Sequence, residues 1–302
     1  MHRRRALQLL AGAVLSPGAT RPLTRSSSAV QPHVMDNDTR PGRAPSRSRS
    51  PSSLDTVGIQ LYTVRHDMER DFEGTLAGLA EIGYREVEFA GFFGRSPAAV
   101  RTALASAGLE GPASHVPAAT VVNETERTLD ETAAAGCRYL VAAWIDADQR
   151  QSPDDWNRWA DRFNRTGEGA RERGLRFAYH NHNYEFPATG GVVPYDVLLA
   201  GTDASRVEFE MDLYWIISAG RDPLAYFARH PGRFPLVHVK DSLGPPDHRM
   251  VDVGRGTIDF VAIFGHREQA GIRHWFVEHD EPESALQSAR VSYDYMRRLR
   301  AP

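Results

Sequence analysis

Two histidines, two asparagines and a glutamate are crowded into one short stretch, Tyr179-His-Asn-His-Asn-Tyr-Glu-Phe186. This stretch follows an apolar run at residues 175–178, and we interpret the two together as a β-strand that reaches residue 182. Side chains alternate between the faces of a strand, so His180 and His182 are expected to point the same way. Imidazole and carboxylate groups are costly to bury without partners. By itself the stretch therefore fits either a functional site or a solvated polar loop.

The same pattern recurs three times further along the chain, where an apolar run ends in a residue able to bind a metal ion or transfer a proton. The runs are Met211-Asp-Leu-Tyr-Trp215, Leu236-Val-His-Val-Lys-Asp241 and Trp275-Phe-Val-Glu-His-Asp280. Their chemically active residues are Asp212, His238, Lys240 and Glu278. Carboxylate and imidazole ligands without thiolates suit a divalent ion, and we expect Mn, with Co, Mg or Zn as alternatives.

Each of these residues also has a structural interpretation. Asp212 could cap a helix, although Leu-Tyr-Trp rather than an evident helix start follows it. A single buried histidine such as His238 is usually structural, but between two valines at a strand end it needs a polar partner. Glu278 has no cation beside it in the sequence. We therefore favour metal binding for all three.

The elements that would position these residues alternate along the chain, with a strand-like run and a helix-like run roughly every 30 residues. Ser96 and Ser152, each followed by a proline, are expected to cap two of the helices. Strands are predicted over residues 57–64, 86–90, 113–116, 139–144, 175–182, 207–212, 234–239 and 274–278. Such a series of strand–helix pairs in about 250 residues predicts an α/β fold, a (β/α)8 TIM barrel.

A doubly wound open sheet is the competing architecture. It requires a glycine-rich phosphate turn after an early strand, whereas Gly254-x-Gly256 comes late and lacks the third glycine. In a barrel the active site lies at the carboxyl ends of the strands. Reading those ends adds Gln60, Glu88 and His115 as candidate substrate contacts.

The composition limits the partners and the compartment. The 302 residues carry a formal net charge of −3, which does not indicate binding to nucleic acid or to an anionic membrane. Cys137 is the only cysteine, so an intramolecular disulfide and a thiolate metal cluster are excluded. No apolar stretch approaches the roughly 20 residues that a membrane span needs.

The amino-terminal residues have a different character. Residues 1–20 begin with Arg3-Arg-Arg5 before a short apolar core and resemble a twin-arginine export signal. Residues 21–53 are rich in Ser, Arg and Pro, which predicts a disordered linker before a catalytic domain at residues 54–302. We expect an exported, periplasmic protein, or a cytoplasmic one if the leader does not function.

At its strand ends the chain resembles the sugar phosphate isomerase/epimerase superfamily, the xylose isomerase-like barrels. The resemblance spans residues 56–299. It is carried by Gly58-Ile-Gln-Leu-Tyr-Thr-Val-Arg65, by the four motifs above and by Val253-Gly-Arg-Gly-Thr-Ile-Asp259. The motifs together are specific to the superfamily but only weakly to any one reaction.

The resemblance implies a divalent metal held by a glutamate from strand five, an aspartate from six, a histidine from seven and a glutamate from eight. The last three correspond to Asp212, His238 and Glu278. At the first position this chain has His180, so either His180 binds the metal or Glu185 swings back from the loop to do so. We favour Glu185 because a carboxylate helps to neutralise the dication.

The departure at strand five bears on the reaction. Metal-bound glutamates in the epimerases move a proton beside a carbonyl, and here an imidazole would take over at least one such role. We expect His180, His182, Lys240 and Glu278 to be catalytic, in an isomerase, epimerase or dehydratase/lyase that acts on a keto sugar such as a 3-keto sugar. Few basic residues lie near the strand ends, which favours a neutral sugar. The alternatives are a non-catalytic sugar-binding barrel and an endonuclease IV-like repair enzyme, and the oligomeric state is left open.

Overall fold

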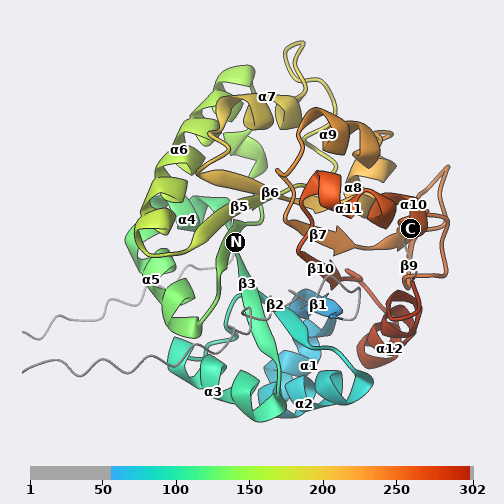
Figure 1. Cartoon of the computed structure of the whole chain (residues 1–302). Coiled ribbons are helices and arrows are strands. Elements are labelled where there is room, and N and C mark those ends of the chain that lie inside the picture. Colours follow the sequence, from blue (N-terminus) through green and yellow to red (C-terminus); the bar gives the residue numbers. More distant parts are fainter. Residues whose placement is uncertain (1–55, 300–302) are drawn as a thin grey trace, which may run out of the picture. The chain divides into compact units, whose positions relative to one another are not determined.

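The computed structural model describes residues 56–299, so the predicted export signal at 1–20 and linker at 21–53 lie outside the described residues. Within residues 56–299 the parallel strands close into a barrel in the order β1-β10-β7-β6-β5-β4-β3-β2, with helices around it (Figure 1). The barrel strands are β1 (Gly58–Gln60), β2 (Glu86–Ala90), β3 (Glu110–Val116), β4 (Tyr139–Ala142), β5 (Arg176–His180), β6 (Val207–Asp212), β7 (Leu236–Val239) and β10 (His274–Val277). The predicted (β/α)8 TIM barrel is confirmed.

The helices connect successive strands on the outside of the barrel (Figure 1). They are α1 (Arg65–Arg70), α2 (Phe72–Ile82), α3 (Pro97–Ala107), α4 (Ala118–Asn123), α5 (Thr125–Ala135), α6 (Pro153–Glu172), α7 (Pro194–Gly201), α8 (Leu213–Ser218), α9 (Pro223–Arg229), α10 (Phe260–Gly265), α11 (Arg267–Ala270) and α12 (Ala285–Met296). Short 3-10 helices η1 (Leu61–Val64) and η2 (Ala147–Gln149) lie in the loops after β1 and β4. A small antiparallel hairpin, β8 (Asp241–Ser242) with β9 (Met250–Val251), follows β7. No helix in this part of the chain is long and apolar enough to span a membrane.

Helix α6 shows how local sequence sets the helix starts. The Ser152 side chain accepts a hydrogen bond from the Asp155 backbone N–H, and the Asp155 carboxylate accepts one from the Ser152 N–H. This reciprocal pair satisfies two backbone donors that a helix start leaves unpaired. The predicted stripe of Trp156, Trp159 and Phe163 is buried against the barrel. Ser96 caps α3 in the predicted way.

Six of the eight barrel strands differ in length from the prediction, among them β1 and β3. β1 ends at Gln60 because the Gln60 side chain accepts from the Tyr62 N–H and turns the chain into η1. β3 begins three residues earlier than predicted, at Glu110 rather than at residue 113. Gly111 and Pro112 have low strand propensity, but Phe89 packs where a Gly111 side chain would lie, and pairing with β2 overrides the local preference.

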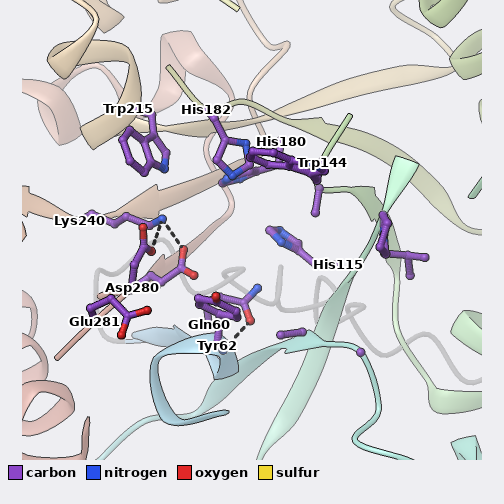
Figure 2. Close-up of a pocket in the computed structure, with 16 residues that line it drawn as sticks. Gln60, Tyr62, His115, Trp144, His180, His182, Trp215, Lys240, Asp280 and Glu281 are labelled. Carbon is purple, nitrogen blue, oxygen red and sulfur yellow. Dashed lines mark hydrogen bonds and ion pairs between the residues drawn. The ribbon is translucent and has the colours of Figure 1, made fainter. Parts of the chain in front are cut away.

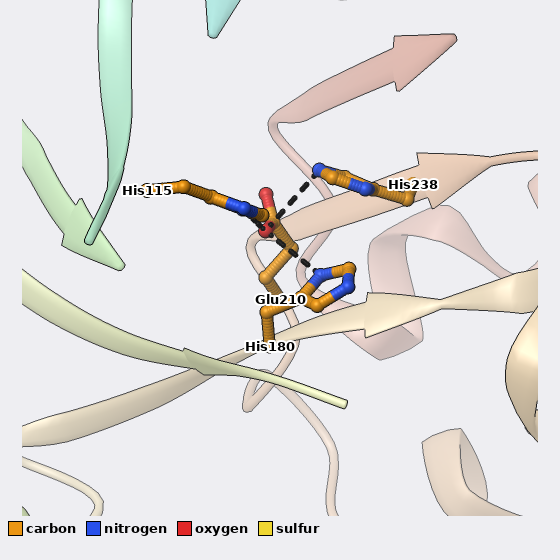
Figure 3. A group of neighbouring side chains, drawn as sticks. All are labelled: His115, His180, Glu210 and His238. Carbon is orange, nitrogen blue, oxygen red and sulfur yellow. Dashed lines mark hydrogen bonds and ion pairs between the residues drawn. The ribbon is translucent and has the colours of Figure 1, made fainter. Parts of the chain in front are cut away.

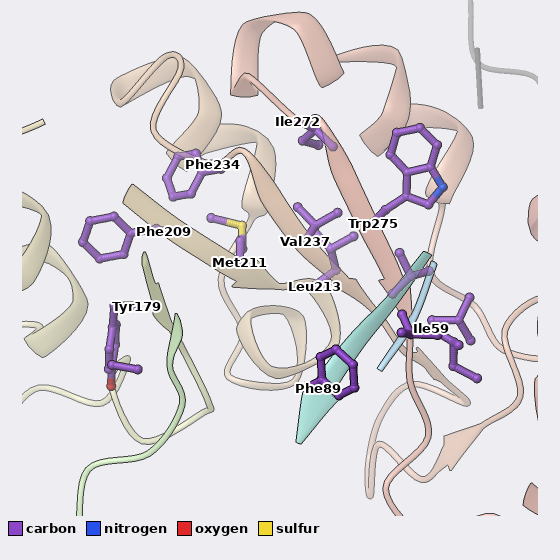
Figure 4. Close-up of a cluster of buried hydrophobic side chains, with 14 of the residues drawn as sticks. Ile59, Phe89, Tyr179, Phe209, Met211, Leu213, Phe234, Val237, Ile272 and Trp275 are labelled. Carbon is purple, nitrogen blue, oxygen red and sulfur yellow. The ribbon is translucent and has the colours of Figure 1, made fainter. Parts of the chain in front are cut away.

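The barrel has two apolar regions, and neither fills the carboxyl end of the lumen, where polar groups lie. A large outer core lies between strands and helices and includes Ile59, Phe89, Tyr179, Met211 and Trp275 (Figure 4). A small inner cluster fills the lumen with Ala113, Tyr139, Val141, Ala178, Leu236 and Phe276. Because side chains alternate along a strand, the next inward positions towards the carboxyl end carry the predicted site residues.

Candidate active site at the carboxyl end of the barrel

A cavity of about 700 Å³ opens at the carboxyl ends of the strands (Figure 2). Six of the predicted site residues line it: Gln60, His115, His180, His182, Lys240 and Glu278. Tyr62, Trp144 and Trp215 add aromatic walls. Cavities of this size with apolar walls and a few convergent polar groups are typical of small-molecule sites.

Lys240 is surrounded by carboxylates. Its Nζ lies 2.9 Å from Glu278 Oε2 and 2.8 Å from Asp280 Oδ1 (Figure 2), and 3.2 Å from Asp212 Oδ2. Burial alone would lower the pKa of Lys240, but these three carboxylates raise it well above the ordinary lysine value. The ammonium is therefore held charged. Lys240 is also the only lysine in the sequence, and all other basic residues apart from histidine are arginine.

The side chains of the site lie in two layers, an upper one at the cavity and a lower one beneath it. His238 contacts both layers, one through each ring nitrogen. Nδ1 lies 2.7 Å from Glu278 Oε2 at the cavity, and Nε2 lies 2.6 Å from Glu88 Oε2 beneath it. Burial would lower the pKa of His238, but Glu210, Glu278 and Glu88 raise it well above the usual value. The imidazole therefore belongs to both layers.

Glu210 lies at the centre of the lower layer (Figure 3). Its Oε2 lies 2.5 Å from His115 Nε2 and 3.1 Å from His180 Nδ1, and the side chain is fully buried. Burial would raise the pKa of Glu210, but His238 and His115 hold it well below the usual value. We did not predict Glu210, because we read only the strand ends. Alternation along β6, which puts Glu208, Glu210 and Asp212 on one face, is the signal that finds it.

The two carboxylate oxygens of Asp212 lie in different environments. Its Oδ1 accepts a hydrogen bond from the Trp215 N–H and caps α8, so the expectation that no helix begins here was wrong. Its Oδ2 is buried without a hydrogen-bond donor and lies 3.8 Å from His180 Nε2. The 3.2 Å approach of Lys240 to this oxygen is an ion pair rather than a hydrogen bond. Burial raises the pKa of Asp212 to about 6.

The structure does not bring Glu185 into this cluster. Its carboxylate accepts from Tyr179 Oη at 2.6 Å and from the His182 N–H at 3.0 Å. Tyr179 belongs to the outer core, so these bonds hold Glu185 behind the strand rather than in the lumen. Burial raises the pKa of Glu185 to about 7.

Glu88, which we expected to contact substrate, lies beneath the cavity and is fully buried. It accepts from Gln60 Nε2 at 2.9 Å and contacts His238, and therefore supports residues that line the cavity. Burial, followed by the charge of Glu210, raises its pKa to about 7.

The rings of His180 and His182 are adjacent, with centroids 5.0 Å apart, although β5 ends before His182. The His182 ring lies near Trp144 and stacks on Tyr184, and its Nδ1 is buried without a partner. Burial lowers the pKa of His180 to about 3, and His238 adds to the effect. Burial likewise lowers the pKa of His182. Both rings are held neutral.

Two sets of side chains converge closely enough to hold an ion: Asp212, His238 and Glu278, and beneath them His115, His180, Glu210 and His238. Asp212 Oδ2, which accepts no hydrogen bond, lies 3.9 Å from His238 Nδ1 in the first set. Carboxylate oxygens and imidazole nitrogens fit a divalent metal, and this donor set does not single out one element.

Comparison with known proteins identifies the family. The family of xylose isomerase-like TIM barrels matches residues 76–299. The chain belongs to this family. Among solved structures, the chain is similar to a sugar phosphate isomerase/epimerase from Parabacteroides distasonis, 25% identical with a TM-score of 0.70, a match that covers 80% of this chain and 97% of that one.

Two further similarities are narrower, one limited to part of the chain and one to the fold. The inosose dehydratase of Lacticaseibacillus casei is 29% identical over 148 residues, which cover 44% of this chain and 49% of that enzyme. The chain thus spans about half the length of the curated relatives it matches. A structure of the IOLI protein with a bound zinc atom shares the fold, with a TM-score of 0.65 and 14% identity over 79% of this chain and 95% of that one.

Proposed function

We propose that this protein is a divalent-metal-dependent enzyme that removes a proton from the carbon beside the carbonyl of a keto sugar or keto polyol. The observation that supports this most strongly is the convergence of carboxylates, imidazoles and one buried ammonium at the end of an aromatic-walled cavity. The names of the relatives, inosose dehydratase and sugar phosphate isomerase/epimerase, are consistent with such chemistry.

The metal ligands that we propose are His180, Asp212, His238 and Glu278. His180 replaces Glu185 in this set because its Nε2 faces Asp212 Oδ2, whereas Glu185 is bonded to Tyr179. Mn is our proposed ion, with Co, Mg or Zn as alternatives. When bound, such an ion polarises the substrate carbonyl and stabilises the enediolate that forms.

Side chains outside the proposed ligand set would transfer the proton and stabilise the developing negative charge. His182 lines the cavity outside the proposed ligand set and would accept the proton from carbon. Lys240 lines the cavity as a fixed positive charge beside the position where negative charge develops on oxygen. Return of the proton to the other face gives an epimer, transfer to the neighbouring carbon gives an isomer, and loss of the β-hydroxyl as water gives a dehydrated product.

The cavity walls indicate a neutral substrate. Tyr62, Trp144 and Trp215 offer flat apolar surfaces of the kind that pack against sugar rings. Lys240 is the one basic side chain other than histidine in the lining, and its charge is offset by three carboxylates. A phosphorylated substrate would lack a free cationic partner here.

Deuterium exchange tests the first step. Purified enzyme is incubated in D2O with inososes and other keto sugars, and recovered substrate and product are analysed by mass spectrometry and NMR. We expect deuterium beside the carbonyl, dependent on added metal, and a loss of about two to four orders of magnitude in the exchange rate for His182→Gln.

The ligand assignment is tested in the same preparation by elemental analysis. Asp212→Asn keeps the cap on α8 but loses the charge, and Glu278→Gln is its counterpart on β10; both are expected to lose the metal. Glu208→Gln is the matched control, because Glu208 lies on the same strand and pairs with Arg176 near its other end. Turnover without carbon-bound deuterium would contradict the mechanism, and full metal occupancy in both variants would contradict the site.

A further inference from the structure

Each of the two imidazoles in the proposed ligand set contacts a buried carboxylate that lies beneath it. His180 presents Nδ1 to Glu210 Oε2 at 3.1 Å, and His238 presents Nε2 to Glu88 Oε2 at 2.6 Å. Glu210 Oε2 also lies 3.3 Å from His238 Nε2. Both carboxylates are fully buried and come from different strands, β6 and β2.

Two contacts in this lower layer are short. The His115 Nε2–Glu210 Oε2 and His238 Nε2–Glu88 Oε2 distances are 2.5 and 2.6 Å. Such separations are typical of charge-assisted hydrogen bonds.

The proton on each lower nitrogen determines what the upper nitrogen offers. A carboxylate accepts hydrogen bonds, so His180 donates through Nδ1–H and His238 through Nε2–H. The opposite nitrogens, His180 Nε2 and His238 Nδ1, are then directed at Asp212 and Glu278. A metal-bound histidine needs this arrangement, because the nitrogen that binds the ion must be free of its proton.

We infer that Glu210 and Glu88 are positioning residues that fix the tautomer and ring orientation of His180 and His238 for metal binding. The inference rests on the proposed function, since it concerns the same metal site. It assigns a role to Glu210, which the strand-end pattern did not reveal. It also explains why two carboxylates are buried beneath the cavity where neither reaches a substrate.

Metal affinity gives the first test. Dissociation constants for Zn2+ and Mn2+ are measured by competition with a chromophoric chelator, using the full chain. Glu210→Gln and Glu88→Gln are expected to weaken binding about 10- to 100-fold. Their matched controls, Glu208→Gln and Glu86→Gln, lie two residues earlier on the same strands and bond to Arg176 and His274 instead. The controls are expected to bind as the wild type does.

Histidine tautomers give a second test that needs neither metal nor activity. In 15N-histidine-labelled, metal-free wild type, NMR is expected to show His180 protonated at Nδ1, with the signal assigned by its loss in His180→Gln. Protonation of His180 at Nε2 alone, or equal affinities for Glu210→Gln and Glu208→Gln, would overturn the inference. Two ions per wild-type chain and one in Glu210→Gln would overturn it in favour of a second metal site. If the wild type bound no ion, the proposed function would fail, while Nδ1 protonation would still support the positioning role.

Discussion

Replacing Lys240 by methionine removes one charge from a cluster that the barrel has buried. The ammonium contacts three carboxylates at 2.8–3.2 Å, and Asp212 is fully buried and Glu278 nearly so. Removing one partner of a buried ion pair leaves uncompensated charge and costs about 3–5 kcal/mol. In a domain of 150–250 residues each kcal/mol lowers the unfolding temperature by about 2–4 °C, so Lys240→Met is expected to lower it by roughly 6–20 °C.

Arginine is not expected to substitute for this lysine. An ammonium is a compact charge with three donors, and here three carboxylate oxygens surround it. The planar guanidinium is larger and fixes its donors in one plane, so Lys240→Arg retains the charge but cannot occupy the same position. Lys240 is the one lysine among the 36 Lys and Arg residues of the sequence.

Thermal and urea unfolding of the metal-free protein measure the effect. The control is Arg127→Met, whose pairs with Glu124 and Glu131 are exposed and screened by solvent, so its stability is expected to stay close to that of the wild type. Added Mn2+ at 100 times its Kd is expected to stabilise the folded protein by about 2.7 kcal/mol, because an ion that binds only the folded state shifts the unfolding equilibrium by mass action. A Lys240→Met protein as stable as the control would refute the argument that the cluster depends on this charge.

Two further predictions concern residues outside the ligand set. Burial raises the pKa of Glu185 from 4.5 to about 7, so the wild type loses about 3 kcal/mol of stability as the pH rises through this range. In urea unfolding between pH 5 and 8, Glu185→Gln is expected to lose less stability with rising pH than the wild type. Its metal content is expected to stay unchanged. An equal pH slope, or a loss of metal, would contradict the assignment of Glu185 to Tyr179. Deleting residues 1–53 is expected to leave the unfolding temperature nearly unchanged, since residues 56–299 already close the barrel, and a large decrease would show that the segment stabilises the domain.

Periodicity predicted the barrel well because parallel strands between helices have strong sequence signals. β2 and β6 have the predicted bounds, and the residues at the ends of β6, β7 and β10 come together as the motifs suggested. β3 was predicted too short because Gly111 and Pro112 carry no strand signal. Its pairing with β2 is a tertiary effect that local sequence does not encode.

The candidate site was harder to predict below its rim. A strand-end pattern identifies residues that reach the cavity, but Glu210 lies one inward position deeper than Asp212. The placement of Glu185 depends on which way the chain turns after β5, and its partner is the hydroxyl of Tyr179 on the opposite face. Neither the turn nor that hydrogen bond follows from residue spacing.

Because one imidazole contacts several carboxylates, the effects of single substitutions in this cluster are not expected to be additive. His238 contacts Glu278 through one nitrogen and Glu88 through the other, so its loss removes a proposed ligand and one partner from each of two buried carboxylates. Residues within one hydrogen-bond network couple by about 0.5–3 kcal/mol. Loss of metal from a His238 variant therefore reports on both layers together. Asp212→Asn, which keeps its bond to the Trp215 N–H, separates ligand charge from structural support more cleanly.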